Sequence, residues 1–82
     1  MVSEQVDKEI FRQLRQRGAG KSICPSEVAR ALFADDNWRE KMNLVRERAC
    51  ILAHDGALRI TQGERTLDPK QEFRGPVRLR LL

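Results

Sequence analysis

The segment Gly18-Ala19-Gly20-Lys21-Ser22 has residue types found at the end of a phosphate-binding loop, where backbone N–H groups cradle phosphates and a lysine reaches the terminal one. The complete motif needs another glycine at position 15, and this sequence has Arg15 there. The motif also follows a strand, whereas the residues before Gly18 have helical spacing. We therefore interpret the segment as a flexible turn between helices and not as a nucleotide site.

Cys24 stands directly before Pro25, at the expected start of a helix. The free N–H groups and dipole of a helix N-terminus favour a thiolate, so one interpretation is a redox or nucleophilic thiol. The other is a small residue that begins the helix. Cys24 has neither a C-x-x-C partner nor a neighbouring histidine in the sequence, which favours the second interpretation.

Cys50 and His54 are spaced so that both would lie on one helix face and could bind a metal together. A structural zinc site needs four protein ligands and a catalytic one usually three, and Cys24 is the only other cysteine. His54 is the single histidine, so no catalytic triad or acid–base pair is recognisable. The sequence predicts a protein that is not an enzyme and has no metal and no cofactor.

The chain of 82 residues is 40% hydrophobic, which suits a single domain over residues 1–82 with one core. Its net charge of +4 is moderate, and the positive excess lies in residues 57–82. The start of the chain lacks an export signal, and no apolar run is long enough for a bilayer. We expect a cytoplasmic, reduced, monomeric protein that does not enter a membrane.

Apolar residues at helical spacing predict the first helix. Val6, Ile10 and Leu14 would share one face, Ser3 would cap the helix, and Gly18 would follow its end. We expect this helix over residues 3–17.

Capping signals frame the next two helices, predicted over residues 25–34 and 37–55. Pro25 suits the first helical position, and Glu27 can reach back to the cap. Asn37 and Glu40 have the spacing of a capping box for the third helix, and Gly56 suits its end.

After Gly56 the apolar period changes to two, which indicates strands. Leu58 and Ile60 alternate with polar residues, and Val77 and Leu79 do the same near the end of the chain. We expect an antiparallel pair of strands at about 57–62 and 76–82.

The intervening residues 63–75 form a long loop, in which Asp68-Pro69-Lys70-Gln71 predicts one helical turn and Phe73 would anchor the loop. The predicted fold is mainly α with a C-terminal β-hairpin. Three helices and a hairpin with a long wing loop are the layout of a winged helix, with helices two and three as its helix-turn-helix.

Several stretches resemble a bacterial family called domain of unknown function 3253. They are the run from Gly18 to Leu32, then Trp38-Arg39 and Met42, and finally the run from Arg74 to Leu81. The resemblance covers nearly the whole chain. It implies a stand-alone, winged-helix-like domain without an established activity, and it assigns no catalytic residues.

Nucleic-acid binding, in a transcription-related role, is the functional hypothesis with the most support in the sequence. With Trp38 facing inward, one flank of the third helix carries Arg39, Asn43 and Arg46, followed by Cys50 and His54. Arginine and asparagine hydrogen-bond base edges in the major groove of duplex DNA. Behind this flank, two groups of cations would meet phosphates. The outer sheet face would carry Arg59, Arg78 and Arg80, and the wing would carry Arg65, Lys70 and Arg74.

Acidic residues weigh against this hypothesis. Asp35 and Asp36 precede the third helix at the end that would approach DNA, and Glu40 and Glu47 lie on its exposed face. Arginines in the wing could also serve only to protect a strand edge from pairing with other chains.

The alternative function is a protein-interaction or accessory module that does not bind nucleic acid. Leu44 and Ile51 form a narrow apolar row outside the main face of the third helix. A small domain needs such area for its core, so we favour packing toward the first helix over a partner surface.

Overall fold

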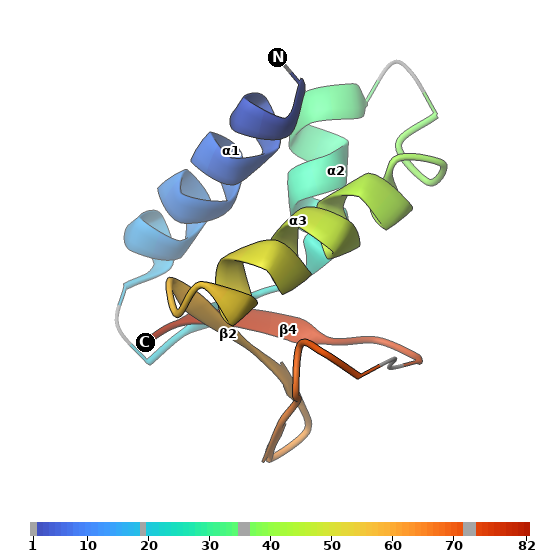
Figure 1. Cartoon of the computed structure of the whole chain (residues 1–82). Coiled ribbons are helices and arrows are strands. Elements are labelled where there is room, and N and C mark those ends of the chain that lie inside the picture. Colours follow the sequence, from blue (N-terminus) through green and yellow to red (C-terminus); the bar gives the residue numbers. More distant parts are fainter. Residues whose placement is uncertain (1, 19, 35–36, 72–73) are drawn as a thin grey trace.

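The computed structural model describes residues 2–18, 20–34, 37–71 and 74–82. It is an α+β fold with helices and an antiparallel sheet, so the predicted mixture of helices and C-terminal strands is confirmed (Figure 1). The elements in chain order are α1 Val2–Arg17, β1 Ser22–Ile23, α2 Pro25–Phe33, α3 Met42–His54, β2 Leu58–Gln62, β3 Arg65–Thr66 and β4 Arg78–Leu81. No helix in the described part of the chain is long and apolar enough to cross a membrane.

The helices lie together on one side of the sheet, and the core fills the space between them (Figure 1). On α1 the spacing of four residues puts Val6, Ile10 and Leu14 on one buried face, as predicted. Each fully buried aliphatic side chain of this size contributes about 1.5–3 kcal/mol through removal of its surface from water. Among the described residues, the core also contains Ile23, Val28, Ala29, Val45, Ala49, Leu58, Ile60, Val77 and Leu79.

The N-terminal cap predicted for α1 is wrong. Helix α1 begins at Val2, so Ser3 already lies inside it. An N-cap residue needs an extended backbone, which a residue within the helix does not have.

Helix α3 begins later than predicted, and the proposed capping box is wrong. Asn37 has a φ of 52°, in the left-handed region, and therefore lacks the extended backbone of an N-cap. Residues 37–41 form turns, in which the Glu40 N–H donates to the Asn37 carbonyl at 2.9 Å and the Lys41 N–H to the Trp38 carbonyl at 3.0 Å. Trp38 packs against the core from this turn instead of from the helix.

The end of α3 is as predicted. Gly56 follows the helix with a φ of +79°, a conformation that glycine adopts without strain. Its N–H donates to the Ala53 carbonyl at 3.1 Å, and the Ala57 N–H donates to the Leu52 carbonyl at 2.9 Å. This pair of hydrogen bonds is the Schellman motif, which satisfies the last carbonyls of the helix and turns the chain into β2.

Strands β2 and β4 pair antiparallel, as predicted, although both are shorter than the predicted ranges. Leu58 lies opposite Leu81 and Ile60 opposite Leu79, so apolar side chains share the face toward the helices. Because side chains alternate along a strand, the residues between them face away from the helices.

The sheet has two strands beyond the predicted pair, and its order is β1-β4-β2-β3. Strand β1 pairs with β4, with Ile23 opposite Leu79. Strand β3 pairs with β2, with Thr61 opposite Thr66 and Gln62 opposite Arg65. Strands of two residues are too short to show an alternating pattern, and for this reason the sequence did not reveal them.

The predicted wing loop therefore begins with a tight hairpin between β2 and β3. We call residues 63–77 the β2–β4 connection. Asp68 to Gln71 form a turn and not the predicted helical turn, with the Lys70 N–H donating to Asp68 Oδ1 at 2.9 Å and the Gln71 N–H to the Asp68 carbonyl at 3.1 Å. The predicted anchor Phe73 lies outside the described residues.

Candidate nucleic-acid interface

The residues predicted to bind nucleic acid lie in separate places. Arg39 is in the turn before α3. Asn43, Arg46 and Arg74 line a hollow between α3 and the β2–β4 connection. Arg65 lines a neighbouring hollow formed by β2 and that connection, which Arg74 also lines. The remaining three lie on the sheet face that points away from the helices: Arg59, Arg78 and Arg80.

Arg39 does not continue the line of Asn43 and Arg46, because α3 begins after it. Its guanidinium lies 4.9 Å from the centre of the Trp38 ring, and that of Arg30 lies 4.5 Å from the same ring. A cation over an aromatic face is stabilised by the ring quadrupole. Arg39 thus holds the α2–α3 corner together with Arg30 and Trp38.

Two hollows on the molecule share the side chains of Gln71 and Arg74 and so form one continuous surface, which we call the α3–connection surface. One hollow is lined by Asn43, Arg46, Glu47, Cys50, Pro69 and Lys70 besides the shared pair. The other is lined by Gln62, Arg65, Thr66, Leu67 and Asp68 besides the same pair. Among the described residues, its cations are Arg46, Arg65, Lys70 and Arg74, and its carboxylates are Glu47 and Asp68.

Side chains from two elements hold the β2–β4 connection in place. Both Nη1 and Nη2 of Arg46 donate to the Gly75 carbonyl at 3.3 Å. The Gln62 Nε2 donates to the Arg74 carbonyl at 2.6 Å and to the Pro76 carbonyl at 3.2 Å. The α3–connection surface is therefore fixed from α3 on one side and from β2 on the other.

Cys50 is the only thiol on this surface among the described residues. Burial raises the pKa of the Cys50 thiol, the Glu47 carboxylate also raises it, and the Arg46 cation opposes them. The thiol is thus neutral near pH 7 and acts as a small, weakly polar wall of the hollow.

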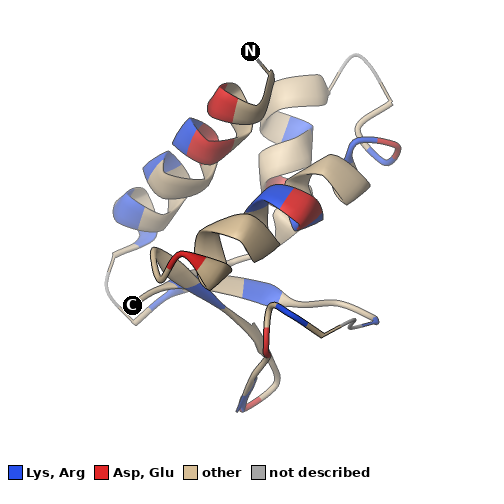
Figure 2. Cartoon of the chain, viewed as in Figure 1, with Lys and Arg blue, Asp and Glu red and all other residues tan. Residues whose placement is uncertain are grey.

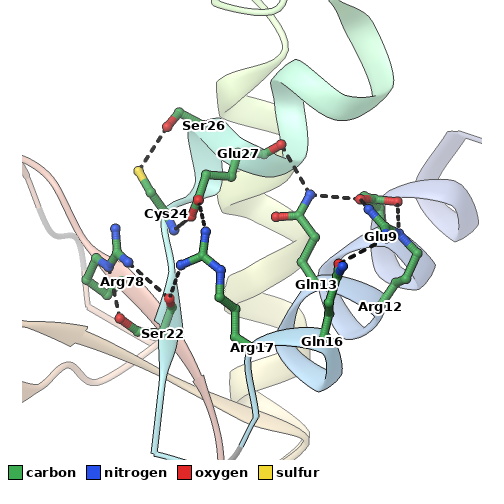
Figure 3. A network of polar contacts seen from close by, with 10 residues as sticks. All are labelled: Glu9, Arg12, Gln13, Gln16, Arg17, Ser22, Cys24, Ser26, Glu27 and Arg78. Carbon is green, nitrogen blue, oxygen red and sulfur yellow. Dashed lines mark hydrogen bonds and ion pairs between the residues drawn. The ribbon is translucent and has the colours of Figure 1, made fainter.

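The sheet-face arginines partly serve the structure itself. Arg78 Nε donates to Ser22 Oγ at 3.0 Å and its Nη2 to the Ser22 carbonyl at 3.0 Å (Figure 3). Arg80 Nη1 donates to the Gly20 carbonyl at 3.0 Å. These bonds attach the short strand β1 and the turn before it to β4.

The segment that resembled a phosphate-binding loop joins α1 to β1. Gly18 has a φ of 95° and Gly20 a φ of 79°, so both occupy backbone geometry that suits glycine. The Lys21 N–H donates to the Gly18 carbonyl at 3.3 Å. The segment connects a helix to a short edge strand, which is not the strand-to-helix context of that motif.

Cys24 is the N-cap residue of α2 and belongs to a polar network (Figure 3). Ser26 Oγ donates to Cys24 Sγ at 3.1 Å, and the Cys24 N–H donates to Glu27 Oε2 at 2.7 Å. Arg17 forms an ion pair with Glu27. Burial raises the pKa of Glu27, but the bond from Cys24 and the Arg17 cation outweigh it, so this pKa is lowered overall.

No group of three or more His, Cys, Asp or Glu side chains within the described residues is placed to hold a metal ion. Cys50 is half-buried beside Arg46 and Glu47, and His54 is exposed, with its Nδ1 4.0 Å from Asp55 Oδ1.

The apolar row of α3 is divided between two environments. Leu44 is half-buried and packs against the core, whereas Ile51 is 40% exposed. One exposed isoleucine is ordinary on a small protein and does not identify a partner surface.

The acidic residues that weighed against nucleic-acid binding also lie in different parts of the chain. Glu40 lines a hollow with Arg39 in the turn before α3, and Glu47 lies on the α3–connection surface. Asp35 and Asp36 lie outside the described residues. Acidic and basic positions are adjacent on α1 and in the middle of α3 (Figure 2).

The sequence did not indicate that Gln62 and Gln71 would belong to the candidate surface. Gln62 lies in a strand and Gln71 in a turn, and no periodic pattern in the sequence connects either residue with α3. They are brought to the surface only by the path of the β2–β4 connection.

A family model described as a protein of unknown function, DUF3253, matches residues 3–82, essentially the whole chain. No curated protein matches the sequence. The chain therefore belongs to the DUF3253 family of proteins of unknown function.

Proposed function

We propose that this chain is a winged-helix domain that binds double-stranded nucleic acid through the α3–connection surface. The order of the elements supports the winged helix: a helix, a short strand, two helices, and then strands joined by a long connection. The short strand β1 pairs with β4 and forms one edge of the sheet, as the strand between the first two helices does in this layout. In this proposal α2 and α3 are the helix-turn-helix, and the β2–β4 connection is the wing.

The observation that carries the proposal is the convergence of cations from α3 and from the β2–β4 connection on one surface. Arg46 comes from α3, and the connection supplies Arg65, which lies in β3, together with Lys70 and Arg74. Phosphates of a duplex are attracted to such a concentration of positive charge. Among the described residues, the two carboxylates Glu47 and Asp68 offset only part of the charge of these four cations.

The side chains have different roles in this proposal. Asn43 is exposed on α3 and has the amide that hydrogen-bonds adenine in a major groove. Arg65, Lys70 and Arg74 contact phosphates. Arg46 holds the connection through Gly75 and acts as a positioning residue.

The domain acts in this proposal by binding, as a monomer and without catalysis of its own. We place it in the cytoplasm, where a reducing environment suits its two free cysteines, Cys24 and Cys50.

The test is a titration of fluorescent duplex DNA with the protein at several salt concentrations, followed by anisotropy. Three or four phosphate contacts give a slope of log affinity against log salt of roughly −3 to −4. The double variant Lys70→Gln/Arg74→Gln should weaken binding and make the slope less steep by about 2. Lys8→Gln is the matched control, since Lys8 is exposed on α1 and lines neither hollow.

Absence of binding at low salt would end the proposal, as would equal losses in Lys8→Gln and the double variant. Binding to a protein in place of duplex would then favour the accessory-module alternative. A variant of Ile51, Ile51→Ser, tests that alternative because Ile51 is the exposed member of the apolar row.

A further inference from the structure

Two arginines lie directly opposite each other on adjacent strands of the sheet. Arg59 of β2 is the cross-strand partner of Arg80 of β4. The neighbours of each along its strand, Leu58 and Ile60 on β2 and Leu79 on β4, are buried toward the helices. Both guanidinium groups therefore belong to the outer sheet face. Like charges directly opposite one another destabilise an antiparallel pair.

No carboxylate compensates this pair among the described residues. The ion pairs formed there join other residues, and none involves Arg59 or Arg80. A shallow hollow contains both arginines, with Thr61, Gly63, Glu64 and Thr66 as the rest of its lining. Glu64 is the one carboxylate among the described residues of this lining, and it lies beyond salt-bridge distance of both arginines.

The two guanidinium groups keep most of their hydrogen-bonding capacity. Arg80 uses Nη1 for the Gly20 carbonyl, which restrains the direction of its side chain. Arg59 is exposed and makes no hydrogen bond or ion pair with another described residue. A guanidinium has five N–H donors, and its planar fork binds phosphate oxygens in pairs.

We propose that Arg59 and Arg80, with Thr66 beside them, form a phosphate-binding site that holds the backbone of a second nucleic-acid segment. An anion bound between the two guanidinium groups offsets their repulsion. Binding of such an anion therefore stabilises the folded protein.

The two arginines of this site lie outside the α3–connection surface, since Arg59 and Arg80 line neither of its hollows. Thr66 lines both the outer hollow and one hollow of that surface, so it lies at the boundary between them. Thr66 is paired with Thr61, while its neighbour Arg65 is paired with Gln62. Adjacent residues of a strand point to opposite faces, so Arg65 faces the helix side and Thr66 the outer side. A straight duplex seated against α3 contacts the helix side of the sheet, and the outer face is left for another segment.

The first experiment needs no ligand. Arg59→Gln removes one member of the like-charge pair and should raise the thermal unfolding midpoint by roughly 1–5 °C at low salt, with a smaller gain at high salt. Lys8→Gln is the control, because Lys8 is an exposed cation on α1 that lines none of these hollows. A fall of the midpoint in Arg59→Gln, or an equal rise in Lys8→Gln, would contradict repulsion between Arg59 and Arg80.

The second experiment uses inorganic pyrophosphate as the probe and thermal unfolding as the readout. Pyrophosphate should raise the midpoint of the wild type and of Lys8→Gln, and should have little effect on Arg59→Gln. A response of Arg59→Gln equal to the wild type would overturn the site. A short polyglutamate peptide that stabilises the wild type as strongly would overturn the choice of phosphate over carboxylate.

The third experiment counts duplex molecules bound per protein at low salt, by calorimetric titration. The wild type should bind a second duplex that Arg59→Gln does not bind. The variant Lys70→Gln/Arg74→Gln should bind the first duplex more weakly and the outer-face one as the wild type does, so the two proposals fail independently. If the wild type binds pyrophosphate at this site but no second duplex, nucleic acid is not the occupant. The occupant would then be a free phosphate compound.

Discussion

Arg48 of α3 binds the Asp7 carboxylate of α1 with two parallel hydrogen bonds, Nε to Oδ1 at 2.9 Å and Nη2 to Oδ2 at 2.7 Å. Each side chain is 24% exposed, so the pair lies at the edge of the core between the two helices. Hydrogen bonding to Asp7 is the largest effect that raises the pKa of Arg48. The fork geometry fixes the direction of α3 relative to α1, and hence the position of the α3–connection surface.

Arg48→Lys should lower the thermal unfolding midpoint by a few degrees, because an ammonium group cannot replace the two parallel hydrogen bonds. Asp7→Asn should lower it at least as much. The control is Arg15→Lys. Arg15 is an exposed arginine of α1, and its guanidinium lies 5.9 Å from the centre of the Phe11 ring. Equal midpoints for Arg48→Lys and the wild type would show that the bidentate pair does not stabilise the fold.

Arg46→Gln and Arg74→Gln should weaken duplex binding in different ways. Arg46 positions the β2–β4 connection, so its loss should reduce affinity with little change in the salt slope. Arg74 contacts phosphate in our proposal, so its loss should make the slope less steep by about 1. Anisotropy titrations at several salt concentrations measure both quantities. A reduced slope in Arg46→Gln would show that Arg46 itself contacts phosphate.

Glu27 should make stability depend on pH. The pKa of Glu27 is lowered from the ordinary value of 4.5, so the folded state binds its proton more weakly than the unfolded state. Its stabilising contribution is complete above about pH 4.5 and is lost as the pH falls through the lowered folded pKa. Urea unfolding between roughly pH 3 and 7 should therefore show a smaller acid-induced loss in Glu27→Gln than in the wild type. Glu4→Gln is the control, since Glu4 is an exposed glutamate at the start of α1, and an unchanged pH profile in Glu27→Gln would refute the prediction.

Gly56→Ala should lower the free energy of unfolding by about 1–2 kcal/mol, because a side chain is strained at positive φ. Nothing lies within 4 Å of a Cβ built at this position, so the cost comes from the backbone and not from a clash. Gly56→Asn should cost less, since asparagine tolerates the left-handed region. Urea unfolding monitored by the fluorescence of Trp38 compares the three proteins. If the alanine and asparagine variants are equally stable, the backbone argument fails.

Local patterns in the sequence were enough to predict the helices and the main strand pair. The apolar spacing of Val6, Ile10 and Leu14 identified α1, the alternation around Ile60 and Leu79 identified β2 and β4, and Gly56 marked the end of α3. These signals are reliable because each depends on residues close together in the chain. The family resemblance was likewise visible in short stretches and is confirmed over residues 3–82.

Only the tertiary structure decided how the charged residues are grouped. Alternation in the sequence already placed Arg59 and Arg80 on the outer sheet face, but only the strand register shows that they lie directly opposite each other. The path of the β2–β4 connection, likewise, brings Arg74 toward α3. The short strands β1 and β3 and the turn at Asn37 also depend on contacts between distant segments. Periodicity reports which face of an element is apolar. It does not report which residues of another element lie beside a given side chain, because that depends on pairing and packing across the whole fold.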